Sequence, residues 1–174
     1  IEKSYSVIES KNPNLENKDE VAKAVGTGAV IFGALQNNKI KDVVFSYDKV
    51  LSFEGETCPY VQYTAVRCKS VLNKCGKATE FAVPENITDD EYNVVSKIAE
   101  FGGVVLSAGE KYEPSLVTRY VIDLAKLYNK FYLSCNVMNS EAGVKVFRLA
   151  LTEATLITIE NGLKLLGITV PDKM

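Results

Sequence analysis

The segment from Phe53 to Leu72 constrains the fold of this chain more than any other. An acidic, glycine-containing loop leads to Pro59, a residue suited to the first turn of a helix. Apolar residues then recur at the i, i+4, i+7 and i+11 positions, and these are Val61, Ala65, Cys68 and Leu72. That rhythm places them on one face of an α-helix. The segment therefore predicts a helix with a single core-facing side.

A different face of the same predicted helix carries two tyrosines and an arginine. Tyr60, Tyr63 and Arg67 occupy positions i, i+3 and i+7. At about 100° per residue they lie within an arc of roughly 60°, and the apolar face is centred roughly 100–120° away. Two phenol rings and a guanidinium thus gather away from the core. We interpret this face as a recognition surface for a flat, anionic partner.

The first third of the chain contains a long helical pattern. Asp19 is a candidate cap for a helix that reaches about Gln36. The Gly26-Thr27-Gly28 stretch inside it indicates close helix packing, because the Lys and Ser/Thr of a phosphate loop do not follow. We expect residues 1–18 to be irregular and residues 43–45 to form a short extended segment.

The second half of the chain predicts three further helices. Thr88 to Glu91 is a capping box for a helix that runs to about Leu106. The Glu113-Pro114 pair starts the next helix. The last one extends from about Ser140 to Leu166 and ends at Gly167, a typical C-terminal glycine. The predicted fold class is all-α, a helical bundle.

Composition restricts the classes of partner. The chain has 174 residues and a net charge of −2, whereas a general nucleic-acid binder is usually basic. An RNA reader of this balance must rely on stacking and on a local basic patch, for which the candidates are Arg67, Lys69, Lys74 and Lys77. Apolar runs stay far below the 18 residues of a membrane span, and no basic, apolar leader is evident. We therefore expect a cytoplasmic protein with no membrane partner.

No credible active site emerges from the residue types. The chain has no histidine, the commonest general base, and its four cysteines form no C-x-x-C pair. We expect free thiols and neither metal ligands nor catalytic residues. Glu54 and Glu56 form the nearest carboxylate pair, but their place before a helix favours interaction with the helix dipole over catalysis.

Three ordered segments resemble one protein family. F-E-G-E-T-C-P-Y-V-Q-Y-T-A-V-R, from Phe53 to Arg67, is similar to the segment of arginyl-tRNA synthetases that leads into the anticodon-binding domain. Glu113 to Tyr120, leading to Asn129-Lys130-Phe131-Tyr132, resembles the same family. So does the stretch from Arg148 to the Leu-Gly-Ile and Pro-x-x-Met ending at Met174. The resemblance covers the chain from about residue 18 onward.

The resemblance implies a division of the chain and a set of partners. Residues 1–52 would be the end of the catalytic half with its connecting helix, and residues 53–174 the helical bundle of the class I synthetase anticodon-binding type. The H-I-G-H and K-M-S-K-S motifs of class I catalysis do not occur here. The resemblance therefore implies arginine–tRNA ligase activity only for a longer protein, which would use ATP and Mg²⁺, and no cofactor for this part. The implied partners are tRNA for arginine and the catalytic half, in a monomer.

Site residues carry over from the family by position. The resemblance implies that Tyr60, Tyr63, Arg67 and Met174 contact the anticodon, with Asn129 and Tyr132 as possible supports. The chemistry is compatible, because splayed anticodon bases can stack on aromatic rings or on a guanidinium plane. Two alternatives remain open from the residues alone: a helical protein-interaction module that uses the same Tyr60/Tyr63/Arg67 face, and, less favoured, a small stand-alone enzyme.

Overall fold

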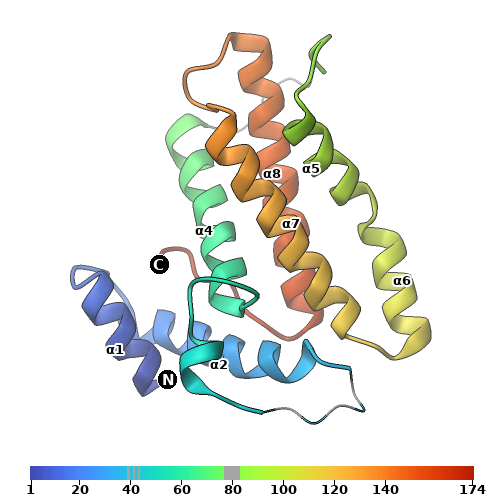
Figure 1. Ribbon diagram of the computed structural model, residues 1–174. Coiled ribbons are helices and arrows are strands. Elements are labelled where there is room, and N and C mark those ends of the chain that lie inside the picture. The colour runs from blue at the N-terminus through green and yellow to red at the C-terminus, as the bar shows by residue number, and fades with distance from the viewer. Residues whose placement is uncertain (39, 41, 43, 77–82) are drawn as a thin grey trace.

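The computed structural model describes residues 1–38, 40, 42, 44–76 and 83–174 (Figure 1). Within these residues every regular element is an α-helix, which confirms the predicted all-α class. In chain order the elements are α1 (Glu2–Lys11), α2 (Lys18–Leu35), α3 (Tyr47–Val50), α4 (Cys58–Cys75), α5 (Asp89–Ala99), α6 (Phe101–Lys111), α7 (Ser115–Ser134) and α8 (Ala142–Leu165).

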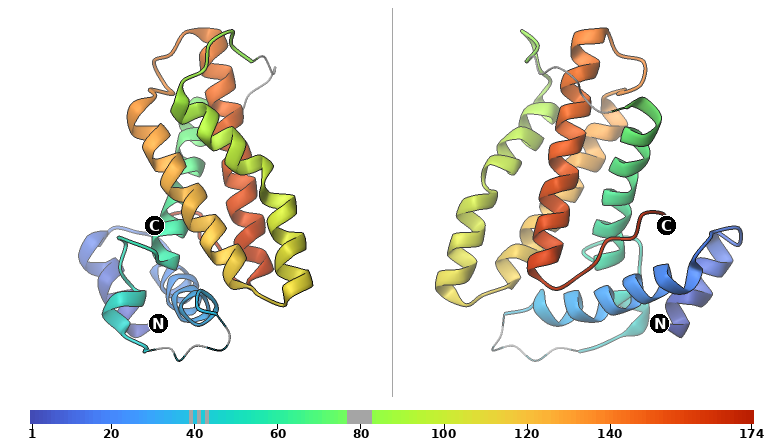
Figure 2. Two further views of the ribbon diagram at one scale, coloured as in Figure 1. Left: turned by 45° about the vertical axis from the view of Figure 1, so that its right-hand side comes forward. Right: turned by 180° about the vertical axis from the view of Figure 1, so that it is seen from behind.

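The helices form a bundle that stands on a smaller helical base. α4, α7 and α8 pack against one another, and α5 and α6 run along the outer side of α7 (Figures 1 and 2). α2 lies across the lower end of α4, with α1 and α3 beside it. The tail after α8 returns past α2 toward α1, so that the C-terminus ends beside the start of α4.

Two groups of buried side chains hold this arrangement together. The larger group lies between α4, α7 and α8 and includes all four apolar residues predicted to face the core from α4. The smaller group joins α1 to α2 through Ile8, Leu15, Val21, Ala22 and Val25. α2 also contributes Phe32 to the larger group. The division at residues 52 and 53 stays a prediction.

The N-terminal segment differs from its prediction. Residues 2–11 are helical rather than irregular, because Ser4 and Ile8, four residues apart, are both buried as α1 packs on α2. α2 begins at Lys18 and is preceded by Asn17, with a φ of 57°, so the predicted cap at Asp19 is wrong. Close packing at Gly28 is confirmed, since a Cβ there would lie 3.0 Å from Cys58 Sγ.

The capping box at Thr88 and Glu91 is confirmed, but the single helix predicted beyond it is divided at Glu100. The backbone N–H of Glu100 bonds to the carbonyl of Lys97, three residues back, which tightens the turn. Gly102 and Gly103 follow at once, and glycine stabilises a helix less than any residue except proline. Both glycines are visible in the sequence, but the helical spacing of the apolar residues favoured one continuous helix.

The end of α6 at Lys111 lies five residues beyond the predicted Leu106, and the remaining boundaries agree with the predictions to within two residues. α7 begins just after Pro114, and α8 is slightly shorter than expected at both ends. Gly167 has a φ of 74°, and the N–H of Ile168 bonds to the carbonyl of Leu163, which confirms the helix-ending glycine. Of the predicted extended segment, Val43 lies outside the described residues, and Val44 and Phe45 belong to neither a helix nor a strand. The helices within the described ranges include none long and apolar enough to cross a bilayer.

Candidate nucleic-acid interface

The start of α4 is fixed by a cap that positions the first tyrosine. Thr57 Oγ1 accepts a hydrogen bond from the backbone N–H of Tyr60 and donates one to the carbonyl of Ser52, at 3.3 Å and 2.6 Å. Pro59 occupies the first turn, as predicted. Thr57 was not among the predicted site residues, although a threonine before a helix-starting proline is a known capping signal.

Arg67 lies over two aromatic rings. Its guanidinium carbon is 5.1 Å from the ring centroid of Tyr63, on α4, and 4.9 Å from that of Tyr132, on α7. These distances are within the range of a cation–π interaction. Tyr63 is 42% exposed and Tyr132 is 39% exposed, so each ring keeps a surface open to a partner.

Asn129 connects this cluster to the first tyrosine. Its side-chain N–H₂ donates to the hydroxyl of Tyr60 and to Thr64 Oγ1, both at 2.9 Å. Its side-chain carbonyl accepts a hydrogen bond from Arg67 Nη1. The structure therefore brings Tyr60, Tyr63, Arg67, Asn129 and Tyr132 together on adjacent faces of α4 and α7, which we call the aromatic–arginine cluster. Thr64 was missed because nothing in its spacing set it apart.

One cavity is lined both by a member of this cluster and by the last residue of the sequence. It has a volume of about 410 Å³, and Tyr63 and Met174 both line it. Met174 also packs against the smaller group of buried side chains between α1 and α2. The other lining residues are Ile8, Lys11, Asn12, Phe53 and Glu54. The predicted fourth site residue thus lies at the same cavity as Tyr63.

A second cavity, also of about 410 Å³, is lined by Arg67 and Tyr132 of the cluster. Its further walls come from α4, from the end of α7 and from the loop between α7 and α8. They are Ser70, Val71, Lys74, Leu133, Ser134, Asn136, Val137, Met138 and Asn139. Arg67 and Lys74 give this cavity two cationic side chains, whereas Lys77 lies outside the described residues.

Two side chains of α4 hold the C-terminal tail. Gln62 Nε2 donates to the carbonyls of Thr169 and Ala24, at 2.7 Å and 3.3 Å. Lys69 Nζ pairs with Asp172 at 2.9 Å and with Glu160 at 3.0 Å. Gln62 was also missed, because a glutamine next to a tyrosine shows no distinctive pattern.

The contacts of Lys69 correct the predicted basic patch. Partial burial lowers the pKa of its ammonium group, but the hydrogen bonds to Asp172 and Glu160 outweigh that effect and raise the pKa above its ordinary value. The two carboxylates compensate the charge of Lys69. Of the described members of the patch, Arg67 and Lys74 face the second cavity, and Lys69 instead anchors the tail.

The carboxylates and thiols considered as catalytic or metal-binding groups have contacts typical of structural residues. Glu56 pairs with Lys126 at 2.7 Å, and the hydrogen bond from Lys126 lowers the pKa of Glu56. All four cysteines are free, and burial raises the pKa of Cys68 to about 12. Over the described ranges no group of three His, Cys, Asp or Glu residues could hold a metal ion.

Comparisons with known proteins agree with the resemblance found in the sequence. The chain matches the DALR anticodon binding domain family over residues 61–174, more than half of its length. It is 50% identical to the arginine–tRNA ligase of Halothermothrix orenii over 179 aligned positions, and 48% identical to that of Clostridium beijerinckii over 176. Both alignments cover 100% of this chain and 31% of the relative.

A solved structure shows the same arrangement of helices. The Thermus thermophilus arginyl-tRNA synthetase superimposes with a TM-score of 0.92 at 33% identity, over 99% of this chain and 30% of that one. The chain therefore spans about a third of the length of the proteins it matches. It belongs to the DALR anticodon binding domain family, in the form that arginine–tRNA ligases carry.

Proposed function

We propose that this chain reads the anticodon of arginine tRNA as part of an arginine–tRNA ligase. The observation that carries the proposal is the aromatic–arginine cluster, in which one guanidinium lies over two half-exposed tyrosine rings and is held by Asn129. Proteins recognise single-stranded RNA bases by stacking them on such rings and by bonding to their edges. The cluster is already assembled before RNA arrives, which lowers the ordering cost of binding.

Each predicted site residue has a distinct task in this proposal. Tyr60 and Tyr63 offer ring faces to unstacked anticodon bases. Arg67 uses its remaining N–H groups for a base edge or a phosphate. Met174 offers a polarisable thioether at the cavity shared with Tyr63. Asn129 and Tyr132 support Arg67 from α7.

The chemical step belongs to the rest of the longer protein. The relatives are about three times as long as this chain, and neither class I catalytic motif occurs here. We infer that arginine, ATP and Mg²⁺ bind the catalytic half, to which residues 1–52 connect, and that the whole enzyme acts as a monomer in the cytoplasm. On its own, this chain is then expected to form no arginyl-adenylate. Arginine-dependent pyrophosphate exchange by the purified chain would contradict that expectation.

The proposal is tested with two transcripts of arginine tRNA, one intact and one with its middle anticodon base changed. We expect the chain to prefer the intact anticodon. A Tyr63→Ala variant should lose roughly 1–3 kcal/mol of binding free energy, the usual contribution of one base–aromatic stack. Tyr63→Phe keeps the ring and should retain most of it. Tyr92→Ala, which removes a 60% exposed tyrosine from α5, is the matched control.

The outcome also separates this function from its alternative. Binding to RNA should weaken steeply as salt rises, because phosphate contacts release counterions. Equal binding to both transcripts, or binding that Tyr63→Ala leaves intact, would contradict anticodon reading by this face. The aromatic–arginine cluster would then be better explained as a protein-binding hot spot, in which tyrosine and arginine are also common.

A further inference from the structure

A buried ion pair joins α5 to α8. Glu91, in the first turn of α5, has a side chain only 3% exposed, and its Oε1 accepts a hydrogen bond from Arg148 Nε at 2.6 Å. Its Oε2 accepts the backbone N–H of Thr88 at 2.7 Å. Both carboxylate oxygens are therefore engaged, and Glu91 holds the guanidinium of Arg148 in one orientation.

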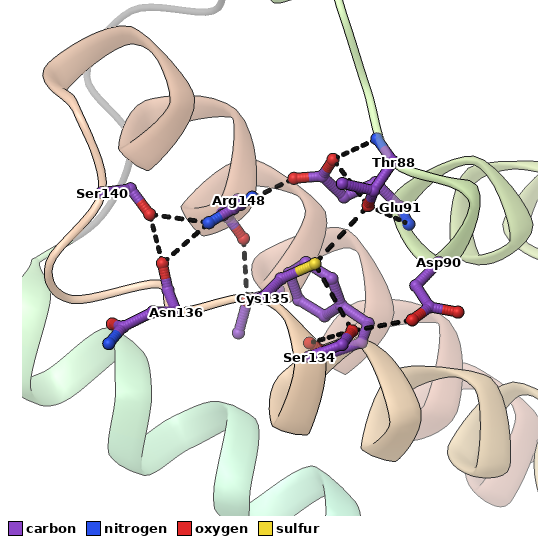
Figure 3. Close-up of polar contacts among 10 residues, drawn as sticks. Thr88, Asp90, Glu91, Ser134, Cys135, Asn136, Ser140 and Arg148 are labelled. Carbon is purple, nitrogen blue, oxygen red and sulfur yellow. Dashed lines mark hydrogen bonds and ion pairs between the residues drawn. The ribbon is translucent and has the colours of Figure 1, made fainter.

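The other end of the same guanidinium holds the loop between α7 and α8, residues 135–141. Arg148 Nη1 donates to the carbonyl of Asn136 at 2.9 Å and to Ser140 Oγ at 2.8 Å. Figure 3 shows Arg148 between Glu91 on one side and Asn136 with Ser140 on the other. Asn136 Oδ1 in turn accepts the backbone N–H of Asn139 at 3.0 Å. One planar donor thus fixes both ends of a short loop.

The same loop is a wall of the second cavity. Asn136 and Asn139 line it together with Val137 and Met138, and Arg67 lines the same cavity from α4. Arg148 does not line the cavity. Asn136 belongs to both the Arg148 contacts and the cavity wall, so any displacement of its backbone reaches the space beside the aromatic–arginine cluster.

We propose that Arg148 is a positioning residue that sets how strictly the second cavity discriminates between anticodons. The inference rests on the proposed function and adds a specificity role for a side chain outside the face that contacts RNA. The cavity is large enough for one unstacked nucleotide. Its loop wall is short and takes two of its hydrogen bonds from Arg148, so loss of those bonds should admit bases that the native wall excludes.

The test uses a double variant, Glu91→Gln with Arg148→Met, which removes the bonds to the loop without leaving a buried charge unpaired. Dissociation constants are measured for an arginine anticodon stem-loop and for stem-loops with one anticodon base changed. We expect the ratio of the dissociation constant for a changed anticodon to that for the native anticodon to fall about threefold to thirtyfold. This is the usual range for a residue that acts through its neighbours. Lys97→Met removes an ion-paired lysine of α5 away from the cavity and is the matched control.

A second measurement separates positioning from general stability. Hydrogen exchange at residues 136–140 should accelerate in the double variant, while exchange in the middle of α4 stays slow. Arg148→Lys keeps a positive charge near Glu91 but lacks the fork that reaches the loop, so it should restore thermal stability more than discrimination.

The two proposals fail in different ways. If the native chain discriminates and the double variant keeps the full ratio, the positioning role of Arg148 is refuted while anticodon reading stands. If the native chain shows no preference between stem-loops, the proposed function fails. Unchanged hydrogen exchange across the loop would overturn the positioning role in either case.

Discussion

The side-chain carbonyl of Asn129 accepts a hydrogen bond from Arg67, and the amide of the same residue donates to Tyr60. One asparagine on α7 thereby sets the orientation of two side chains that leave α4 almost two turns apart. An asparagine side chain has both donors and an acceptor, and here each kind is used. A side chain with only donors or only acceptors could not make both kinds of hydrogen bond.

Asn129→Ala should weaken RNA binding without unfolding the chain. Arg67 would lose its acceptor and Tyr60 its donor, so both would have to be ordered when RNA binds. We expect binding to weaken about tenfold and the free energy of unfolding to fall by about 1–2 kcal/mol. Titration with an anticodon stem-loop and denaturant unfolding measure the two effects. Asn73→Ala, at an exposed position of α4, is the control, and an equal loss of binding there would argue against a specific role for Asn129.

Substitutions of Lys69 and Lys74 should have different effects on the salt dependence of RNA binding. Lys69 is engaged by Asp172 and Glu160, whereas Lys74 is exposed and lines the second cavity. Lys74→Met should therefore reduce the slope of log K against log salt concentration by about 0.7–0.9, the value for one phosphate contact. Lys69→Met should leave the slope unchanged and weaken binding only by loosening the tail that carries Met174. A reduced slope for Lys69→Met would show that Lys69 reaches a phosphate after all.

Glu91 should make stability depend on pH in a defined window. Burial opposes ionisation of its carboxyl, but hydrogen bonds from Thr88 and Arg148 prevail and hold its pKa below the ordinary value of 4.5. A group with a lowered folded-state pKa stabilises the fold above its unfolded-state pKa, and that contribution is lost as the pH falls through the folded-state pKa.

The free energy of unfolding, measured by urea denaturation from pH 7 to pH 3, tests this expectation. The native chain should lose stability steeply below about pH 4.5, and Glu91→Gln should be less stable at pH 7 by about 3 kcal/mol, as for other broken buried pairs. Its stability should also fall less steeply with pH. Glu56→Gln, at the exposed pair with Lys126, should follow the native profile closely. Parallel profiles for the native chain and Glu91→Gln would rule out this origin of acid sensitivity.

Two glycine-to-alanine substitutions should change the free energy of unfolding in opposite directions. A Cβ at Gly162 would lie 2.5 Å from Val121 Cγ1, where α8 meets α7, whereas a Cβ at Gly102 would meet nothing within 4 Å. Gly162→Ala should therefore cost about 1–3 kcal/mol through overpacking. Gly102→Ala should stabilise α6 by about 1 kcal/mol, because alanine favours the helix. Thermal unfolding of the two variants measures both effects, and stabilisation by Gly162→Ala would mean that α7 and α8 can move apart without cost.

Local signals in the sequence were sufficient for most of the helices. The capping box at Thr88, the proline at position 59 and the glycine at position 167 each specify a helix end through short-range geometry, and all three predictions are confirmed. α1 could not be predicted in the same way. Its helix depends on the burial of Ser4 and Ile8 against α2, a contact that no local pattern announces.

The candidate site shows the same limit. Helical spacing placed Tyr60, Tyr63 and Arg67 on one face, and the resemblance added residues from α7 and the tail. Spacing could not show that Lys69 turns toward Asp172, more than a hundred residues later in the chain. The connection of Arg148 to Asn136 was equally hidden, because it depends on how α8 and the preceding loop fold back on each other.

α4 buries one side in the core, and over the same turns another side carries its three residues of the aromatic–arginine cluster. An inserted or deleted residue inside it would rotate everything beyond that point by about 100° and would spoil both sides together. Differences in length between related chains should therefore fall outside α4, in the loops that precede and follow it. Substitutions inside α4 are therefore compatible with both sides, whereas insertions and deletions are not.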